Sequence, residues 1–210
     1  SAEGSSFSAG HDLKELKTGR KNTDKGKFFF KEVMGKCSKL MKSIVNNPKP
    51  VIAEVAGVAT AAGCQLVASC DLAYAGKSAK FATPGVNIGL FCSTPMVALS
   101  RNVSNKESME MLLTGELVSS EKAEKIGLIN KAVDDSLLQA YTLEIALKIS
   151  KKSSMTLKTG KEAFYKQVDM SLSDAYDYAS NVMVENMLKI DAEEGINAFI
   201  EKRNPNWQDK

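Results

Sequence analysis

The stretch from Val51 to Cys70 constrains the fold more than any other part of the chain. Val51–Val55 is a short apolar run of the kind that forms a buried strand, and Gly57 ends it. The following segment, Ala59–Cys70, is predicted to be a helix made mostly of small residues that opens on Ala61-Ala62-Gly63. Small residues let backbones approach one another closely, so the pattern predicts a tightly packed strand–turn–helix unit.

The rest of the chain places short strands first and helices afterwards. Ser1–Gly10 is expected to be a loop, and Phe28–Val45 a helix that Pro48 and Pro50 end. Further strands are expected at Asp71–Ala75 and Lys80–Ala82, with a turn at Pro84-Gly85. After Lys106 the pattern is almost wholly helical, with helices expected at Lys106–Leu113, Ser120–Ile126, Ser136–Ile149, Ser154–Val168, Leu172–Met187 and Ala192–Arg203. This order predicts an α/β core with a helical appendage.

The length of 210 residues suits one domain, with a core portion at 1–135 and a helical region at 136–210. The net charge of +3 gives no argument for nucleic acid or a membrane surface as a partner. No stretch approaches the roughly 20 apolar residues of a membrane span. One cluster is basic, and we interpret it as a solvated face, with attraction of an anionic ligand as the alternative: Lys14, Lys17, Arg20, Lys21, Lys25 and Lys27.

The four cysteines form no CxxC pair and no short-range cluster with the single histidine, so the sequence predicts no metal site. Their low density favours a reducing environment over a small secreted scaffold.

Two segments carry candidate chemistry. Phe7–Leu13 holds a glycine between small residues, and Gly57–Gln65 follows a strand and opens a helix, where unpaired amides attract negative charge. If both segments aim an N–H at one carbonyl oxygen, they form an oxyanion hole. Taken singly, each segment is better explained as a tight turn or as close helix packing than as a ligand site.

Together these segments resemble the enoyl-CoA hydratase/isomerase (crotonase) family. The matching stretches are FSAGHDLKEL, KPVIAEVAGVATAAGCQLVASCDLAYA, KFATPGVNIGLF and GINAFIEKRNPNW. The resemblance implies an α/β fold of ββα turns that form a spiral, with opening strands upstream of the first motif and missing from this chain. It implies C-terminal helices that pack a homotrimer or a dimer of trimers. It also implies a coenzyme A thioester (acyl-CoA or enoyl-CoA) as ligand, no separate cofactor, and a mitochondrial address supplied by a transit segment outside this chain.

By position, the resemblance implies that the backbone amides of Ala9 and Ala62 form the oxyanion hole. The family usually has a glycine where Ala62 stands. The other substrate-binding positions implied by the resemblance, or by their place beside these motifs, are Ser8, Gly10, His11, Asp12, Cys92, Ser93, Phe199 and Lys202. Phe199 and Lys202 match positions that reach the coenzyme A of a neighbouring subunit, although Lys202 also suits a solvated helix end.

The hydratase pattern breaks at two positions. Hydratases of the family use two glutamates for proton transfer, and these fall on Gln65 and Gly85. An amide does not exchange protons near neutral pH, and glycine has no side chain, so we expect no ordinary hydratase activity.

Three alternatives remain open. The chain binds thioesters without turnover, or it is an active enzyme (an isomerase, thioesterase, decarboxylase or residual hydratase) that uses relocated groups such as His11, Cys92 or Ser93. The third alternative is a scaffold or RNA-binding member of the family. For each of these three side chains, packing or solvent exposure is the simpler explanation. We expect Asp12 and Asp71 to cap helices or to pair with lysines.

Overall fold

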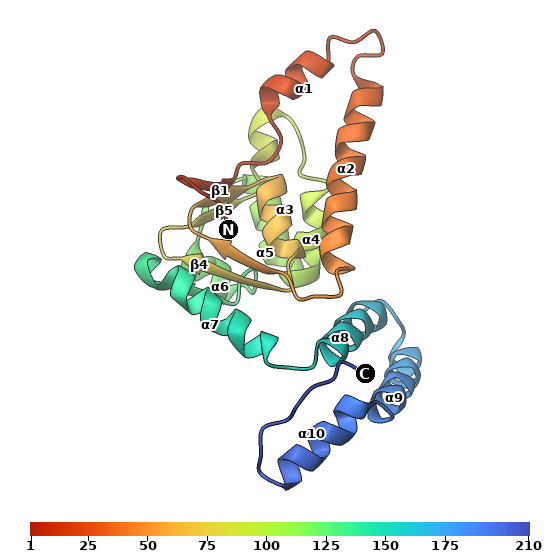
Figure 1. The fold of residues 1–210 in the computed structure, drawn as a ribbon. Helices are drawn as coiled ribbons and strands as arrows, with labels where there is room; N and C mark the ends of the chain where they lie inside the picture. Colours follow the sequence, from red (N-terminus) through yellow and green to blue (C-terminus); the bar gives the residue numbers. More distant parts are fainter. The chain divides into compact units, whose positions relative to one another are not determined.

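The structure is a computed structural model that describes all residues from Ser1 to Lys210 (Figure 1). The chain forms two compact units. The first comprises 1–45 and 51–143, and the second comprises 46–50 and 144–210. Helix α7 (Leu138–Ser150) begins in the first unit and ends in the second.

The first unit contains two small sheets. Strands β1 (Ser6–Ser8), β3 (Val58–Thr60), β5 (Lys80–Ala82) and β6 (Val118–Ser119) form one sheet in that order, with only β6 antiparallel. The other sheet is all parallel, in the order β2 (Ile52–Val55), β4 (Leu72–Gly76) and β7 (Lys131–Val133). Successive strands β2 and β3, and then β4 and β5, enter different sheets, with helix α3 (Ala62–Ser69) between the pairs. This alternation is the ββα repeat that the family resemblance implies.

Several helices surround these sheets. Helices α1 (Leu13–Gly19) and α2 (Lys27–Val45) connect β1 to β2, and a 3₁₀ helix, η1 (Pro84–Ile88), follows β5. Helices α4 (Pro95–Asn102), α5 (Asn105–Thr114) and α6 (Ser120–Lys125) complete the unit, with a 3₁₀ turn, η2 (Asp135–Leu137), before α7.

Four strand assignments from the sequence are wrong or missing. β1 lies within the expected loop Ser1–Gly10, and β3 takes the beginning of the expected helix Ala59–Cys70, which starts only at Ala62. β6 and β7 lie between the helices expected after Lys106, where no strand is expected. Each of these strands is two or three residues long, so it owes its existence to pairing with distant strands and leaves no periodic pattern.

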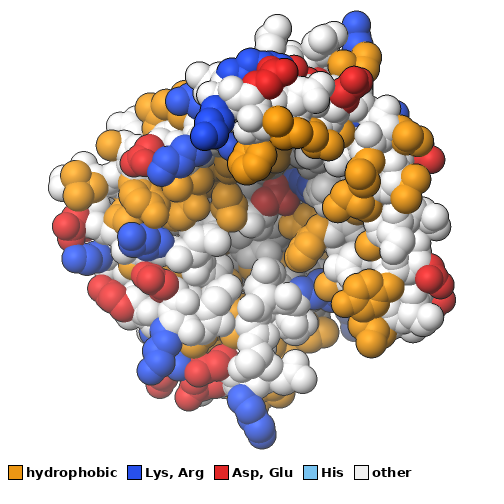
Figure 2. All heavy atoms as spheres, turned by 90° about the horizontal axis from the view of Figure 1, so that it is seen from below, with side chains coloured by type: hydrophobic (Ala, Val, Ile, Leu, Met, Phe, Trp, Pro, Cys, Tyr) orange, Lys and Arg blue, Asp and Glu red, His pale blue; other side chains and the backbone are white.

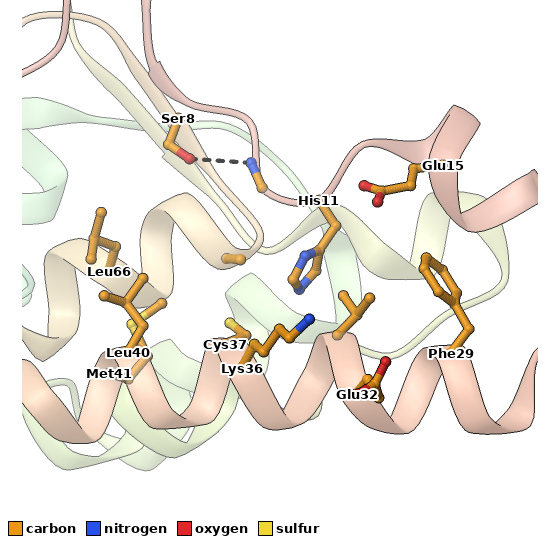
Figure 3. A pocket seen from close by; sticks show the side chains of 13 residues that line it. Ser8, His11, Glu15, Phe29, Glu32, Lys36, Cys37, Leu40, Met41 and Leu66 are labelled. Carbon is orange, nitrogen blue, oxygen red and sulfur yellow. Dashed lines mark hydrogen bonds between the residues drawn. The ribbon is translucent and has the colours of Figure 1, made fainter. Parts of the chain in front are cut away.

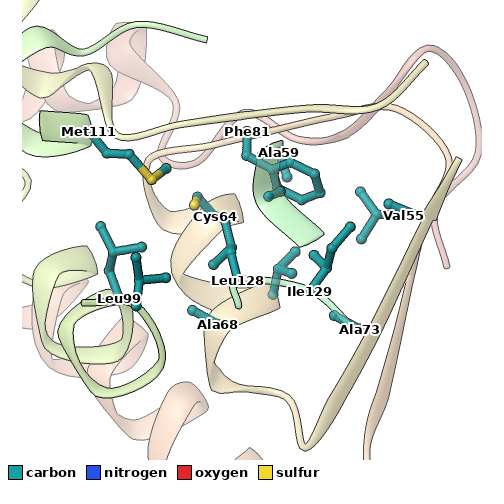
Figure 4. Packing of buried hydrophobic residues seen from close by; sticks show 14 of the residues in the cluster. Val55, Ala59, Cys64, Ala68, Ala73, Phe81, Leu99, Met111, Leu128 and Ile129 are labelled. Carbon is teal, nitrogen blue, oxygen red and sulfur yellow. The ribbon is translucent and has the colours of Figure 1, made fainter. Parts of the chain in front are cut away.

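The core of the first unit lies around α3. Six of the eight residues of this helix are buried, including Gly63, Cys64 and Val67. Phe81, Leu99 and Val55 are the largest side chains that are almost completely buried around it (Figure 4). The small residues of α3 allow it to be enclosed on most sides, which fixes the position of its N-terminus.

Local capping agrees with the sequence. Asp12 caps α1 by accepting the N–H of Lys14 at 2.7 Å, and Ser119 caps α6 by accepting the N–H of Lys122 at 3.2 Å. Asp71 instead accepts the N–H of Val51 at 2.6 Å and so ties the beginning of β2 to the chain just before β4.

The second unit consists of the end of α7 with helices α8 (Ser154–Gln167), α9 (Leu172–Met187) and α10 (Ile190–Ile200). Its C-terminal tail folds back on these helices: Asp191 accepts the N–H groups of Gln208 and Asp209, and Trp207 Nε1 donates to the carbonyl of Lys151.

Large apolar side chains stay exposed on this unit, among them Leu172 at 77% and Phe199 at 86%. Figure 2 shows groups of apolar side chains, with charged side chains scattered among and around them, on the face of the molecule seen from below. None of the helices has the length and apolar character needed to cross a bilayer.

Candidate functional site

The two predicted ligand-binding segments meet because their backbones are packed against each other. β1 pairs in parallel with β3, with Ser6 opposite Val58 and Ser8 opposite Ala59. A Cβ on Gly63 would overlap the carbonyl oxygen of Ser8. The first turn of α3 therefore rests directly on the end of β1, and a larger residue at position 63 would separate them.

The contact continues at Gly10 and Ala62. Gly10 has a φ of +90°, and a Cβ on it would lie 3.1 Å from the amide nitrogen of Ala62. Ala62 is the first residue of α3, so its N–H has no acceptor within the helix. The positive end of the helix dipole adds to the attraction of this amide for an oxygen that carries partial negative charge.

The backbone at the start of α3 is strained. Ala61 has φ 51° and ψ −119°, a conformation that residues with a side chain rarely adopt. Its N–H donates to Ala82 O at 2.9 Å, and its carbonyl accepts the N–H of Gln65 at 3.0 Å. These bonds hold Ala61 in this conformation at the start of α3.

A cavity of about 430 Å³ opens beside this junction (Figure 3). Its walls come from the end of β1, from the N-terminus of α3 and from one face of α2. The lining residues are Ser8, Gly10, His11, Glu15, Phe29, Glu32, Val33, Lys36, Cys37, Leu40, Met41, Ala62 and Leu66.

Four of the predicted substrate-binding residues line the cavity: Ser8, Gly10, His11 and Ala62. Ala9 stands between two of them, and its carbonyl accepts Thr60 Oγ1 at 3.4 Å. Asp12 lies outside the lining, because its carboxylate caps α1.

His11 is the one imidazole of the chain and points from the β1–α1 connection toward α2 (Figure 3). Its Nε2 is inaccessible to solvent and has no hydrogen-bond partner. A buried, unsatisfied nitrogen is unusual and is expected to find a partner when the cavity is occupied.

Gln65 is buried one turn into α3, and its Oε1 accepts the thiol of Cys37 at 3.8 Å. The Gln65 side chain therefore lies behind the cavity wall and contacts it through Cys37. Burial raises the pKa of the Cys37 thiol, so this group stays protonated near neutral pH.

Gly85 is buried in η1 and has no space for a side chain. A Cβ there would lie 2.8 Å from Leu90 O and 2.9 Å from Cys92 Sγ. The Gly85 N–H donates to that sulfur at 3.3 Å.

Cys92 and Ser93 lie outside the cavity lining. Burial raises the pKa of the Cys92 thiol against a smaller opposing effect of the Gly85 N–H, which disfavours a reactive thiolate. The Ser93 hydroxyl donates to Phe91 O at 3.3 Å and has no histidine as its partner. Of the three candidates for relocated chemistry, only His11 lies in the cavity.

Phe199 and Lys202 belong to the second unit, at the end of α10. Phe199 is the most exposed large apolar residue, and Lys202 has a φ of +56° just beyond the helix. That conformation usually belongs to glycine, so the chain turn that presents Lys202 is strained.

The opposite wall carries polar groups that were not predicted from the sequence: Glu15 from α1, and Glu32, Lys36 and Cys37 from α2. The signal was present, because Phe29, Glu32, Lys36 and Leu40 recur at three- and four-residue spacing along one helix face. Polar residues that interrupt such an otherwise apolar face indicate a solvent-filled or ligand-filled space. No group of three or more His, Cys, Asp or Glu is arranged to hold a metal ion.

Comparison with known proteins agrees with this geometry. The sequence profile of the enoyl-CoA hydratase/isomerase family matches residues 1–210. The mouse protein named enoyl-CoA hydratase domain-containing protein 3, mitochondrial, is 53% identical over 208 residues, which is 99% of this chain and 67% of that protein.

Two solved structures are also similar. Human enoyl Coenzyme A hydratase domain-containing protein 3 is 52% identical, with a TM-score of 0.93 over 99% of this chain and 80% of that chain. An enoyl-CoA hydratase of Mycobacterium smegmatis is 45% identical, also with a TM-score of 0.93, over 98% of this chain and 78% of that chain. The predicted crotonase fold is confirmed, and the chain belongs to the enoyl-CoA hydratase/isomerase family.

Proposed function

We propose that this protein binds acyl-CoA or enoyl-CoA thioesters and does not act as an ordinary enoyl-CoA hydratase. The thioester carbonyl accepts hydrogen bonds from the N–H groups of Ala9 and Ala62. The observation that supports this most is the backbone contact of Gly10 with Ala62 at the mouth of a cavity, where the first amide of α3 has no acceptor within the helix.

The expected lack of hydratase activity follows from the residues at positions 65 and 85, which are Gln65 and Gly85. Water addition needs one group to activate water and another to protonate the α-carbon, and each typically contributes a factor of about 10² to 10⁴. Gln65 offers only an amide behind the cavity wall, and the space beside Gly85 is filled by Cys92. The site would then polarise the thioester carbonyl but would have no group to transfer a proton. Such a site suits binding, sequestration or regulation of fatty-acid thioesters.

The cellular setting is part of the same proposal. The mouse relative is named as mitochondrial, and we extend that location to this protein. We also propose a homotrimer or a dimer of trimers, in which the second unit covers its exposed apolar residues and presents Phe199 and Lys202 to the coenzyme A of a neighbouring subunit.

A panel of coenzyme A derivatives tests the binding role, with affinity measured by calorimetry and turnover by absorbance. Each thioester is paired with the thioether of the same chain length, which lacks only the carbonyl. Loss of two hydrogen bonds predicts weaker thioether binding by about 5- to 100-fold. Equal affinities would exclude the oxyanion hole, and hydration of crotonyl-CoA at a typical enzymatic rate would exclude the non-hydratase role.

One observation favours a second candidate, an isomerase, thioesterase or decarboxylase that uses His11. The His11 Nε2 is buried without a partner in the same cavity as Ala62. His11→Gln keeps hydrogen-bonding capacity but cannot exchange protons near neutral pH. If the panel reveals turnover of a thioester and His11→Gln keeps it, His11 is not the acid or base of that reaction. If the variant loses both the turnover and its dependence on pH, the protein is an enzyme that uses His11, and the binding-only role is wrong.

A further inference from the structure

The basic residues of the first unit are concentrated on one hairpin, formed by α1, the following connection and α2 (residues 13–45). This hairpin contains ten Lys or Arg and three Asp or Glu, a net charge of +7. Since the whole chain carries +3, all the remaining residues together carry −4. The near-neutral total therefore conceals a strongly basic surface element.

None of these cations is neutralised within the structure. All ten are exposed, and none makes an ion pair. They are Lys14, Lys17, Arg20, Lys21, Lys25, Lys27, Lys31, Lys36, Lys39 and Lys42. Uncompensated like charges repel one another, so their concentration is unfavourable for folding, and an external anionic partner would relieve the repulsion.

Helix α2 separates two faces. Phe29, Val33 and Met41 contribute to the cavity wall on one side. Lys27, Lys31 and Lys42 recur at separations of four and eleven residues, which bring them to the opposite side of the helix. Phe28 shares that basic side and is 68% exposed.

We infer that the basic face of α2, with the adjacent lysines of the hairpin, binds peripherally to the surface of a bilayer that contains anionic phospholipids. A helix with lysines and an exposed aromatic residue on one face suits the headgroup region, where the charges meet phosphates and the ring enters the acyl boundary. Nine of the ten cations are lysines, which act as point charges on a diffuse anionic surface, whereas specific nucleic-acid contacts favour the planar arginine. The cavity faces the other side of α2 and stays open in this arrangement.

Vesicle sedimentation tests the inference, with full-length protein and vesicles of phosphatidylcholine alone or mixed equally with phosphatidylglycerol. We expect binding to the mixed vesicles only, and loss of binding as salt approaches 1 M, where the screening length falls to about 3 Å. The triple change K27Q/K31Q/K42Q should weaken binding roughly a hundredfold, since each lysine near such a surface contributes a factor of about five.

Matched variants distinguish vesicle binding by the basic face of α2 from a general effect of positive charge. K106Q/K125Q/K158Q removes the same number of exposed cations outside the hairpin and should leave vesicle binding within about twofold. Phe28→Ser should reduce it several-fold at unchanged charge. Equal loss in both triple variants would overturn the inference, as would binding of a single-stranded RNA oligonucleotide in the absence of vesicle binding. Acyl-CoA affinity should be unchanged in all these variants, so failure here is distinguishable from failure of the proposed thioester binding.

Discussion

Gly85 and Cys92 exclude a side chain from the place between them: the Gly85 N–H donates to Cys92 Sγ at 3.3 Å, and the same sulfur lies 2.9 Å from where a Cβ on residue 85 would stand. Under the proposed function, this is where a hydratase of the family would carry one of its glutamates. A glutamate introduced at position 85 alone would therefore collide with the Leu90 carbonyl and the Cys92 sulfur, so a single substitution should not restore the carboxylate.

Gly85→Ala is expected to lower the free energy of unfolding by about 1–3 kcal/mol, because the added methyl group meets the Leu90 carbonyl and the Cys92 sulfur in a buried site. Urea denaturation measures the change. Adding Cys92→Ala should recover part of the loss, since one of the two clashes disappears while the backbone clash remains. Unchanged stability of the single variant would show that the turn relaxes freely.

Gln65→Glu is expected to leave crotonyl-CoA unhydrated, because the second proton-transfer group is still missing. Burial should raise the pKa of the new carboxyl above its unfolded value near 4.3. Stability should then match the parent below about pH 4 and fall as pH rises through the interval between the two pKa values, by about 1.4 kcal/mol per pKa unit. Unfolding at several pH values measures this, and Gln65→Met is the neutral control. A pH-independent difference would mean that water reaches position 65.

Ala61→Gly should stabilise the protein by about 0.5–1 kcal/mol. Relief of the positive φ is worth about 1–2 kcal/mol, and the greater freedom of glycine in the unfolded chain offsets part of it. Ala62→Gly is the matched control, because Ala62 has helical geometry. This change should lower the free energy of unfolding by about 0.5–1 kcal/mol. Thermal unfolding shows whether each change raises or lowers the stability of the protein. If both changes destabilise, Ala61 is not strained.

The C-terminal tail should detach in acid. The Arg203 guanidinium and the Asn206 N–H lower the pKa of Glu194 to about 2. A depressed pKa gives stabilisation that is complete above the unfolded value near 4.3 and is lost as pH falls toward 2. Trp207 is the only tryptophan and lies in this tail, so its fluorescence should change over that interval. Glu194→Gln should show the detached signal already at pH 7, whereas a transition at the same pH in this variant would assign it to another group.

Cys37 should be protected from alkylation by bound thioester. It lines the cavity, while Cys70, also partly buried, lies outside the lining and serves as the internal control. Burial raises the pKa of the Cys37 thiol, so labelling with N-ethylmaleimide should be slow at pH 7 and faster at pH 9. Mass spectrometry with and without an acyl-CoA measures both rates. Equal labelling of Cys37 in the two samples would place the ligand elsewhere.

Sequence patterns predicted the longer elements well. Helix α9 was expected at Leu172–Met187, where the structure has it, because its apolar periodicity is local. β6 was missed, since Val118–Ser119 becomes a strand only by pairing with residues of β5 that are distant in sequence. For the candidate site, Ala62 was assigned by position from the family resemblance, and it lines the cavity. The opposite wall with Glu32 and Lys36 was not predicted, because the spacing of these residues along α2 does not by itself show that this face of the helix borders a cavity.

The pairing of Ser6 with Val58 also bears on how the molecule folds. These residues are about fifty positions apart, and the basic hairpin is the loop that must close between them. Helix α2 consists of local contacts, so we expect it to form early, whereas we expect β1 to pair with β3 only after this long loop has closed. On this expectation the cavity forms late, and slow docking of β1 would leave a folded core that has no ligand site.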